Sequence, residues 1–201
     1  MKTLAIDTSA GTSIAVLDRD LVLAEVNYLE NMTHAERIGA AIKEVLASAD
    51  LKPVGIDRVV VGLGPGPFTG LRVGIAAAKF FAIGSGAEIV GVCSLDAIAF
   101  DFFKQYAAAI LLVTTDARRK ELFWATYTGV TNGIPNRDFG PAVNKPEDIP
   151  TSGLLTTDLV VSAAALGQIA FNQGAKAQTE ITPIYLREPD ATPGKGKKVS
   201  G

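Results

Sequence analysis

The order of strand-like and helical segments in the first half of the chain constrains its fold more than any other feature. Three short apolar runs, at residues 3–7, 13–17 and 21–27, are separated by a glycine-containing turn and an Asp-Arg-Asp turn, which is the spacing of consecutive antiparallel strands. Helices and strands then alternate. The expected helices are 34–48, 70–83 and 94–106, and the expected strands are 58–62 and 88–92. The predicted order is therefore βββαβαβα.

Capping residues support two of these helices. Thr33 precedes the first helix, and Glu36, three residues after Thr33, stands at the capping-box position. Ser94 is predicted to cap the third helix. Three antiparallel strands followed by alternating helices and strands give a mixed sheet with helices on its faces, which is the order of a ribonuclease-H-like unit.

A reduced second copy of this unit is predicted to follow the first. Residues 109–115 and 121–128 have the pattern of a new hairpin, but 129–157 is rich in Gly, Pro, Asn and Asp, and only 163–172 is clearly helical. We therefore expect a first subdomain at 1–106, a degenerate second subdomain at 107–188 and a disordered basic tail at 189–201.

The scarcity of two residue types excludes several chemistries. The 201 residues contain a single histidine, His34, and a single cysteine, Cys93. A zinc or iron–sulfur site built from Cys and His takes about four ligands, and a disulfide within the chain takes two cysteines. We therefore predict no metal site in this chain, a structural role for His34 and a core position for Cys93.

Composition and charge predict a soluble, cytoplasmic protein that does not bind nucleic acid unaided. Hydrophobic residues make up 48% of the chain, yet no stretch reaches the roughly 20 apolar residues of a membrane span, and no signal peptide is evident. The formal net charge of −2 becomes −5 without the tail lysines Lys195, Lys197 and Lys198. Unaided nucleic-acid binding normally needs a basic surface, so only the tail offers an alternative, as a weak phosphate-contacting arm.

A loop rich in glycine and proline, at residues 64–72 (GPGPFTGLR), joins a predicted strand to a predicted helix, where free helix N–H groups can bind a phosphate. It is not a P-loop, because Leu71 stands where the phosphate-binding lysine would be, and Thr69 replaces the third glycine of a dinucleotide fingerprint. Its two prolines also lack N–H donors. Two interpretations stay open: a phosphate site that includes Gly64 and Gly66, or a stiff turn between strand and helix.

The helix after this loop is apolar on every face. Arg72 and Lys79 are the only charged residues between positions 71 and 83. A surface helix on a sheet normally shows a polar stripe, so a helix without one is expected to be covered on all sides. Either a partner protein or the chain's own second subdomain supplies that cover. The first helix adds small residues that permit close approach of another helix: Ala35, Gly39 and Ala40.

Two further polar segments are candidates for chemistry. Asp7, Thr8 and Ser9, at the end of the first strand, resemble the phosphate-binding hairpin of actin-like ATPases, although an Asp at this place can equally cap the turn. Residues 116–121 (DARRKE) form a predicted hairpin tip with three cations between two acids. The cations can pair with these acids, or an arginine can reach a partner's carboxylate or a phosphate.

Six motifs, in order along most of the chain, resemble the TsaB (YeaZ) family. They are residues 6–9 (IDTS), 33–37 (THAER), 64–74 (GPGPFTGLRVG), 92–97 (VCSLDA), 116–119 (DARR) and 183–187 (PIYLR). The resemblance implies the α/β actin-like/Hsp70-like ATPase fold and a place in the bacterial machinery that makes N6-threonylcarbamoyladenosine in tRNA reading ANN codons. The chain departs from the family at Pro67, where a serine is expected, and its second half is short.

The resemblance also implies a non-catalytic subunit, without catalytic residues, whose first two helices pack against TsaD or, when alone, against a second copy. TsaD transfers the threonylcarbamoyl group, and TsaE contributes an ATPase. ATP or ADP and a metal are expected in these partners and none on this chain alone, with tRNA reached only through the complex. The implied interface residues are His34, Ala35, Ile38, Ile42, Arg72, Ile75, Ala76, Lys79 and Arg118, of which Arg118 faces TsaD and its nucleotide. A vestigial nucleotide site would comprise Asp7, Thr8, Ser9, Gly64 and Gly66.

Two enzyme classes and a binding module are the alternatives to a scaffold. An ATP-binding enzyme of the actin-like class would use Asp7 and the loop at Gly64, but the reduced second subdomain would supply only half of the nucleotide cleft. A peptidase of the glycoprotease-like group would need a second histidine for a metal, or a nucleophile–base pair, and neither is evident. A bare tRNA-binding module is disfavoured by the acidic body of the chain.

Overall fold

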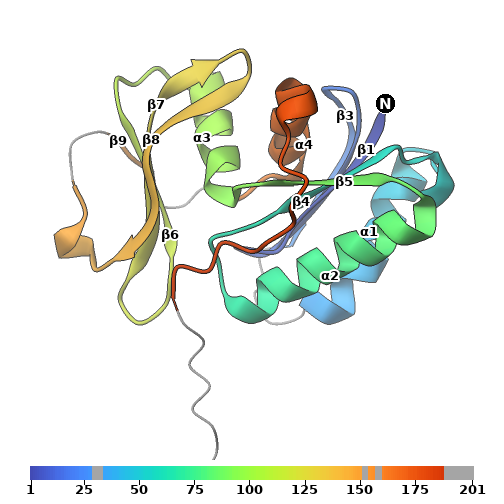
Figure 1. The fold of residues 1–201 in the computed structure, drawn as a ribbon, viewed down its shortest axis with the longest axis horizontal. Helices are drawn as coiled ribbons and strands as arrows, with labels where there is room; N and C mark the ends of the chain where they lie inside the picture. The colour runs from blue at the N-terminus through green and yellow to red at the C-terminus, as the bar shows by residue number, and fades with distance from the viewer. Residues whose placement is uncertain (29–33, 151–153, 157–159, 188–201) are drawn as a thin grey trace, which may run out of the picture.

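The computed structural model describes residues 1–28, 34–150, 154–156 and 160–187, which form two β-sheets. The larger sheet has five strands in the order β3-β2-β1-β4-β5 (Figure 1). They are β1 (Lys2–Asp7), β2 (Thr12–Asp18), β3 (Leu21–Tyr28), β4 (Arg58–Gly62) and β5 (Glu88–Val92). β2 pairs antiparallel with β1 and β3, whereas β4 is parallel to β1 and β5. The predicted mixed sheet is confirmed.

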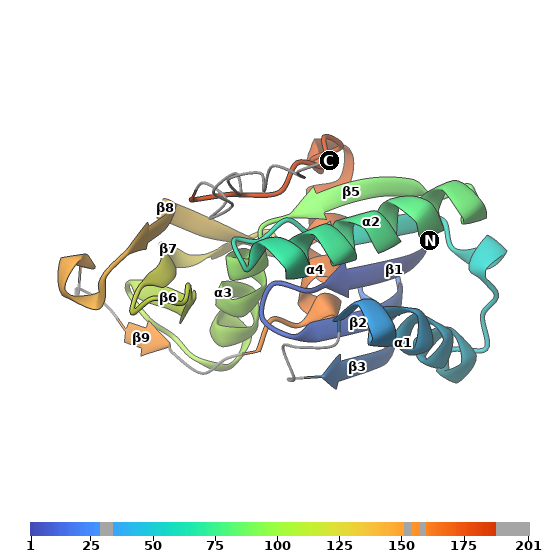
Figure 2. The ribbon, with the colours of Figure 1, turned by 90° about the horizontal axis from the view of Figure 1, so that it is seen from below.

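Helices cover both faces of this sheet. They are α1 (His34–Ser48), α2 (Phe68–Ser85), α3 (Ser94–Gln105) and α4 (Ala163–Gln173). Because successive strand residues point to opposite faces, Leu4 and Ile6 pack with α1 and α2, whereas Ala5 packs with α3 and α4. In Figure 1 α1 and α2 lie below the sheet and α4 lies above it; Figure 2 shows the same layers from below. The larger sheet therefore has helices on both of its faces, as the sequence predicts.

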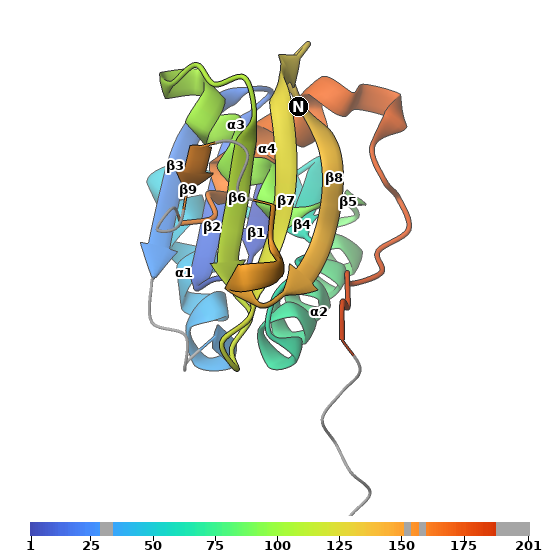
Figure 3. The same cartoon turned by 90° about the vertical axis from the view of Figure 1, so that its left-hand side faces the viewer.

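The second sheet has four strands in the order β8-β7-β6-β9, seen face-on in Figure 3. They are β6 (Leu111–Asp116), β7 (Leu122–Thr131), β8 (Ile134–Asn144) and β9 (Leu154–Thr156). Leu111, Val113 and Tyr127 on its inner face belong to the same buried cluster as the apolar side chains of α3. α3 thus lies between the two sheets. Three short 3₁₀ helices are η1 (Pro53–Gly55), η2 (Pro146–Asp148) and η3 (Gly174–Lys176).

The segment 129–157, which is rich in Gly, Pro, Asn and Asp, contains the long strand β8, for which no element was predicted from the sequence. Asn132 and Gly133 join β7 to β8 with φ angles of 52° and 73°. Asn-Gly is a preferred sequence for a two-residue hairpin turn that needs left-handed residues at both positions. β7 and β8 stay paired along their length, although the register between them shifts at several places between Trp124 and Val130. The turn signal was therefore present inside the Gly- and Asn-rich stretch.

The caps of the helices differ from the prediction at one place. Cys93, not Ser94, is the N-cap of α3, because the Ser94 hydroxyl donates instead to Asp7. α2 begins two residues before the predicted start, at Phe68, and ends at Ser85; its C-cap Gly86 has a φ of 76°, the left-handed conformation typical of a glycine cap. The predicted cap at Thr33 and the predicted disorder of 189–201 lie outside the described residues.

The C-terminal segment, defined here as residues 178–187, returns to the larger sheet (Figure 3). The Gly91 N–H donates to the Gln178 carbonyl at 2.8 Å, which forms a bridge at the β5 edge. Further along, the Ile184 N–H donates to the Leu63 carbonyl at 2.8 Å. Together with α4, this segment makes the last part of the chain a cover for the first sheet.

Two glycines of α2 give a matched test of how this helix packs against Thr8, at the end of β1. A Cβ on Gly74 would overlap the Thr8 side chain, whereas a Cβ on Gly84 has no atom within 4 Å. We expect Gly74→Ala to lower the free energy of unfolding by about 2 kcal/mol, because Thr8 must shift and loses its hydrogen bond to Gly70. Gly84→Ala should raise it by about 0.5–1 kcal/mol. Chemical denaturation measures both, and equal effects of the two changes would contradict the described contact.

Candidate functional site

A buried carboxylate lies where β1 ends. Asp7 is 1% exposed, and its Oδ1 accepts hydrogen bonds from the Ser9 N–H at 2.7 Å and the Ser9 hydroxyl at 2.6 Å. The Ser94 hydroxyl donates to Asp7 Oδ2 at 2.6 Å and accepts from the Gly64 N–H at 3.1 Å. Such charge-assisted bonds stabilise a carboxylate away from water. Asp7 therefore ties the β1–β2 turn, the start of α3 and the Gly-Pro loop together.

The residues of the candidate nucleotide site come together at this carboxylate, but they pack against each other. Thr8 and Ser9 are 1% and 7% exposed, and the Thr8 hydroxyl donates to the Gly70 carbonyl at 2.8 Å. A Cβ on Gly66 would lie 2.8 Å from the Ser9 Cα, so the loop rests directly on the β1–β2 turn. Gly64 has a φ of 91° and is buried. This packing supports the interpretation of the loop as a stiff turn.

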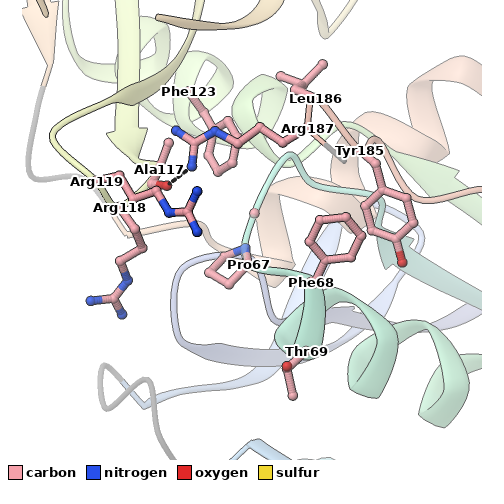
Figure 4. A pocket seen from close by; sticks show the side chains of 11 residues that line it. Pro67, Phe68, Thr69, Ala117, Arg118, Arg119, Phe123, Tyr185, Leu186 and Arg187 are labelled. Carbon is pink, nitrogen blue, oxygen red and sulfur yellow. Dashed lines mark hydrogen bonds between the residues drawn. The ribbon is translucent and has the colours of Figure 1, made fainter. Parts of the chain in front are cut away.

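Beside the loop lies a pocket of about 230 Å³ that joins three of the sequence motifs. Figure 4 shows Pro67, Phe68 and Thr69 at the start of α2 beside the β6–β7 turn, with the Arg187 side chain reaching toward Ala117 of that turn and Tyr185 on the far side of Phe68. The Arg187 guanidinium donates to the Ala117 carbonyl at 2.9 Å and forms an ion pair with Glu121. The C-terminal segment thereby fixes the position of the β6–β7 turn.

The β6–β7 turn has a strained backbone. Arg118, Arg119 and Lys120 have φ angles of 62°, 57° and 61°, three consecutive left-handed residues without a glycine. Each such residue costs roughly 1–2 kcal/mol. Asp116 accepts a hydrogen bond from the Arg118 N–H at 2.7 Å, and its Oδ2 lies 3.8 Å from Arg118 Nε. Local pairing, one of the two interpretations of this tip, thus applies to Arg118, whose side chain stays 61% exposed.

Arg72 on α2 is held by two aromatic rings. The rings of Phe68 and Tyr185 stack with centroids 4.2 Å apart, and the Arg72 guanidinium carbon lies 5.4 and 5.8 Å from these centroids. Arg72 Nε also donates to the Tyr185 hydroxyl at 3.1 Å. About two turns further on, Lys79 Nζ donates to the Ile181 carbonyl at 3.2 Å. The C-terminal segment therefore covers one flank of α2.

A row of exposed side chains remains on α2 beside the flank that the C-terminal segment covers. We call it the outer stripe; its members are Arg72, Ala76, Lys79, Phe80 and Ile83. The spacing of three and four residues puts them on one face of the helix. Phe80 is 76% and Ile83 is 78% exposed. The helix that the sequence predicts to be covered on all sides is thus covered by this chain on all but one face.

The predicted interface residues fall into three groups. Arg72, Ala76 and Lys79 are exposed on the outer stripe, and Arg118 is exposed at the β6–β7 turn. Ile38 and Ile75, each 7% exposed, lie in the core beneath α1 and α2, and Ile42 is half-buried. His34 and Ala35 belong to α1, but their side chains lie outside the described part of the structure.

A partly buried ionic network between α3 and the second sheet was not predicted from the sequence. Arg137 donates to Asp96 through Nε at 3.1 Å and a terminal nitrogen at 2.9 Å, and the Tyr127 hydroxyl donates to Asp96 at 2.7 Å. Burial raises the pKa of the Asp96 carboxyl, and the charge of Arg137 lowers it. Burial also raises the pKa of the Cys93 thiol to about 12. An acid in the first turn of a largely apolar helix was the only available signal.

Neither a metal centre nor a membrane span is found in the described ranges. Among residues 1–28, 34–150, 154–156 and 160–187, no group of three or more His, Cys, Asp and Glu side chains could hold a metal ion. No helix within these same ranges is both long and apolar enough to cross a bilayer.

Comparison with known proteins identifies several similar chains. Residues 28–186 match the family described as TsaD, tRNA N6-adenosine threonylcarbamoyltransferase. A Mycobacterium tuberculosis H37Rv protein named as uncharacterized is 40% identical over 207 residues, covering 94% of this chain and 93% of its own length. The tRNA threonylcarbamoyladenosine biosynthesis protein TsaB of Escherichia coli K12 is 33% identical over 147 residues, covering 73% of this chain and 64% of its own length.

Solved structures match the fold. YeaZ from Pseudomonas aeruginosa superposes with a TM-score of 0.79 over 92% of this chain and 99% of its own, at 23% identity. The βββαβαβα sheet with a smaller second sheet is the α/β actin-like ATPase fold that the sequence predicts.

The ionic network around the buried Asp96 predicts a strong effect on stability. Arg137→Met should lower the free energy of unfolding by about 3 kcal/mol, because it leaves the Asp96 carboxylate buried without its cation. Lys104→Met, which removes a surface pair with Asp101, should cost less than about 1 kcal/mol. Adding Asp96→Asn to Arg137→Met should restore part of the loss. Urea denaturation gives all three values, and an Arg137→Met effect as small as that of Lys104→Met would refute the role of the network.

Cys93 gives a second test. With a pKa of about 12, only about one thiol in 10⁴ is ionised at pH 8, and the thiolate is the reactive form. We expect the folded protein to take up almost no iodoacetamide at pH 8 and the protein in guanidinium chloride to take up one equivalent. Intact mass spectrometry measures the uptake. Rapid labelling of the folded chain would contradict the burial of Cys93.

Proposed function

The chain belongs to the TsaD/YeaZ family, and we propose that it is a non-catalytic scaffold subunit that binds and activates TsaD. The modification in question is N6-threonylcarbamoyladenosine in tRNA reading ANN codons, and the site of action is the cytoplasm. The match to the E. coli protein named TsaB supports this choice within the family. The observation that carries the proposal is the outer stripe of α2.

The outer stripe has the character of a protein interface. Large apolar side chains with three quarters of their surface exposed, such as Phe80 and Ile83, are stabilised when a second protein removes them from water. Ala76 lies between the two cations of the stripe and lets a partner helix come close. The Arg72 side chain is already ordered by its aromatic neighbours, which reduces the entropy lost on binding.

The proposed contacts follow from this arrangement. Arg72, Ala76 and Lys79 would touch TsaD directly, while Ile38 and Ile75 would support α1 and α2 from the core. Arg118, exposed at the β6–β7 turn, would face TsaD and its nucleotide. The free chain would use the same helices for a homodimer. TsaE and tRNA would join only in the assembled complex, and ATP or ADP and a metal would be held by the partner subunits.

The enzyme alternatives find less support. Asp7, which an actin-like ATPase would use near a metal–phosphate cluster, is 1% exposed and receives hydrogen bonds from Ser9 and Ser94. A peptidase would need a metal-binding pair of histidines or a nucleophile beside a base, and the sequence has a single histidine. The polar groups of the candidate sites thus act in the packing of the chain itself.

Association with TsaD tests the scaffold function. On a sizing column, an equimolar mixture of this chain and TsaD should elute as one complex. Ala76→Arg should abolish that complex, because a long charged side chain enters the closest helix contact. Ala175→Arg is the matched control, since Ala175 is exposed in η3, next to α4 on the other side of the sheet. Loss of the complex with both variants, or with neither, would exclude α2 as the interface.

The absence of catalysis is tested separately. We expect the isolated chain to hydrolyse no ATP in a phosphate-release assay with Mg²⁺. Turnover that copurifies with the chain through two chromatography steps and disappears in Asp7→Asn would overturn the scaffold function in favour of an ATPase. Circular dichroism of the variant shows whether it is folded, so that lost turnover is not mistaken for unfolding.

A further inference from the structure

The charges on the outer stripe of α2 are all of one sign. Residues 68–85 contain two cations, Arg72 and Lys79, and no Asp or Glu. Both cations are exposed, and Ala76 lies between them on the same face. Within the described part of the chain, neither cation forms an ion pair with a carboxylate; Arg72 donates to the Tyr185 hydroxyl and Lys79 to the Ile181 carbonyl. Their charges are therefore left for a partner to compensate.

The structure also fixes where these charges point. Arg72 is held beside the stacked rings of Phe68 and Tyr185, with its Nε bonded to the Tyr185 hydroxyl. A guanidinium has five N–H donors in a rigid fork, so its terminal nitrogens stay available to a carboxylate. Lys79 is held on the same side by the Ile181 carbonyl. Ordered cations lose less entropy when they pair across an interface.

We infer that the outer stripe selects a partner helix that carries carboxylates and disfavours a second copy of this chain. In a twofold pair of α2 helices that meet at Ala76, each Arg72 lies about 6 Å along the axis from the crossing and faces the cations of the second copy. The stripe has no acid to offer in return. Like charges placed opposite each other suppress the wrong pairing, and a partner with Asp or Glu one turn from its own small residue relieves the repulsion.

The selection of an acidic partner helix over a second copy rests on the proposed function in one respect, namely that α2 is the contact surface. It adds that the homodimer and the complex with TsaD respond to salt in opposite directions. At about 0.1 M salt the screening length is about 10 Å, so charges across a helix contact still interact, and at about 1 M it falls to about 3 Å. Salt should therefore strengthen self-association and weaken the complex.

A charge swap within this chain tests the inference without TsaD. The double variant Arg72→Glu/Lys79→Glu should associate with the wild-type chain about tenfold more tightly than either chain associates with itself in 50 mM NaCl. Sedimentation velocity with one chain fluorescently labelled measures the three dissociation constants. The neutral variant Arg72→Gln/Lys79→Gln serves if the acidic one does not fold, and it should self-associate more tightly than wild type. A mixed dimer no tighter than the wild-type homodimer would overturn the inference.

Binding to TsaD is the second part of the test. In 50 mM NaCl the Arg72→Glu/Lys79→Glu variant should bind TsaD about tenfold more weakly than wild type, and 500 mM NaCl should narrow the difference. Lys145→Glu/Lys176→Glu makes the same change in net charge away from α2 and should bind as wild type does. Equal weakening by both variants, or by neither, would refute charge selection by the stripe while the scaffold function stands. If wild type itself fails to bind TsaD, the scaffold function fails and the charge swap alone decides the inference.

Discussion

The hydrogen bonds around the Asp7 carboxylate are the constraint on which the rest of the structure depends. A buried carboxylate is costly unless donors surround it, and here they come from the β1–β2 turn and from α3. Gly62 must be a glycine, because a Cβ there would overlap this carboxylate. Through Ser94 the same group holds Gly64, which begins the loop that leads to α2. The direction of α2, and with it the outer stripe, is therefore set from the end of β1.

Much of the fold could be predicted from periodicity, since strands and helices leave regular apolar patterns. The strands 58–62 and 88–92 and the α1 range coincide with the structure. Side-chain partners leave no such pattern. Ser94 fits a helix cap by residue type, yet its hydroxyl serves Asp7, which lies 87 positions earlier in the chain. Arg137 lies in a stretch for which no strand or helix was predicted from the sequence, so its bonds to Asp96 could not be foreseen.

In the candidate site, too, the motifs could be predicted from the sequence, whereas their contacts could not. The loop, the DARR turn and the PIYLR motif are each visible in the sequence, but their meeting around one pocket depends on the fold. The sequence of α2 does not indicate which face of the helix is exposed, because every face has the apolar composition of a core. Only the packing separates Ile75, which is buried, from Ala76, which is exposed. Two neighbouring residues with similar chemistry thus have different roles.

The contacts between the C-terminal segment and the outer stripe of α2 depend on the order of synthesis. Arg72 and Tyr185 are 113 positions apart, and ribosomes add about 5–20 residues each second. The ring that orders Arg72 is therefore synthesised about 6–23 s after the arginine itself. Until then Arg72 and Phe68 lack their contacts with Tyr185, and Leu63 lacks the bond from Ile184. A nascent chain, or one truncated before Tyr185, therefore presents an α2 surface that lacks these contacts.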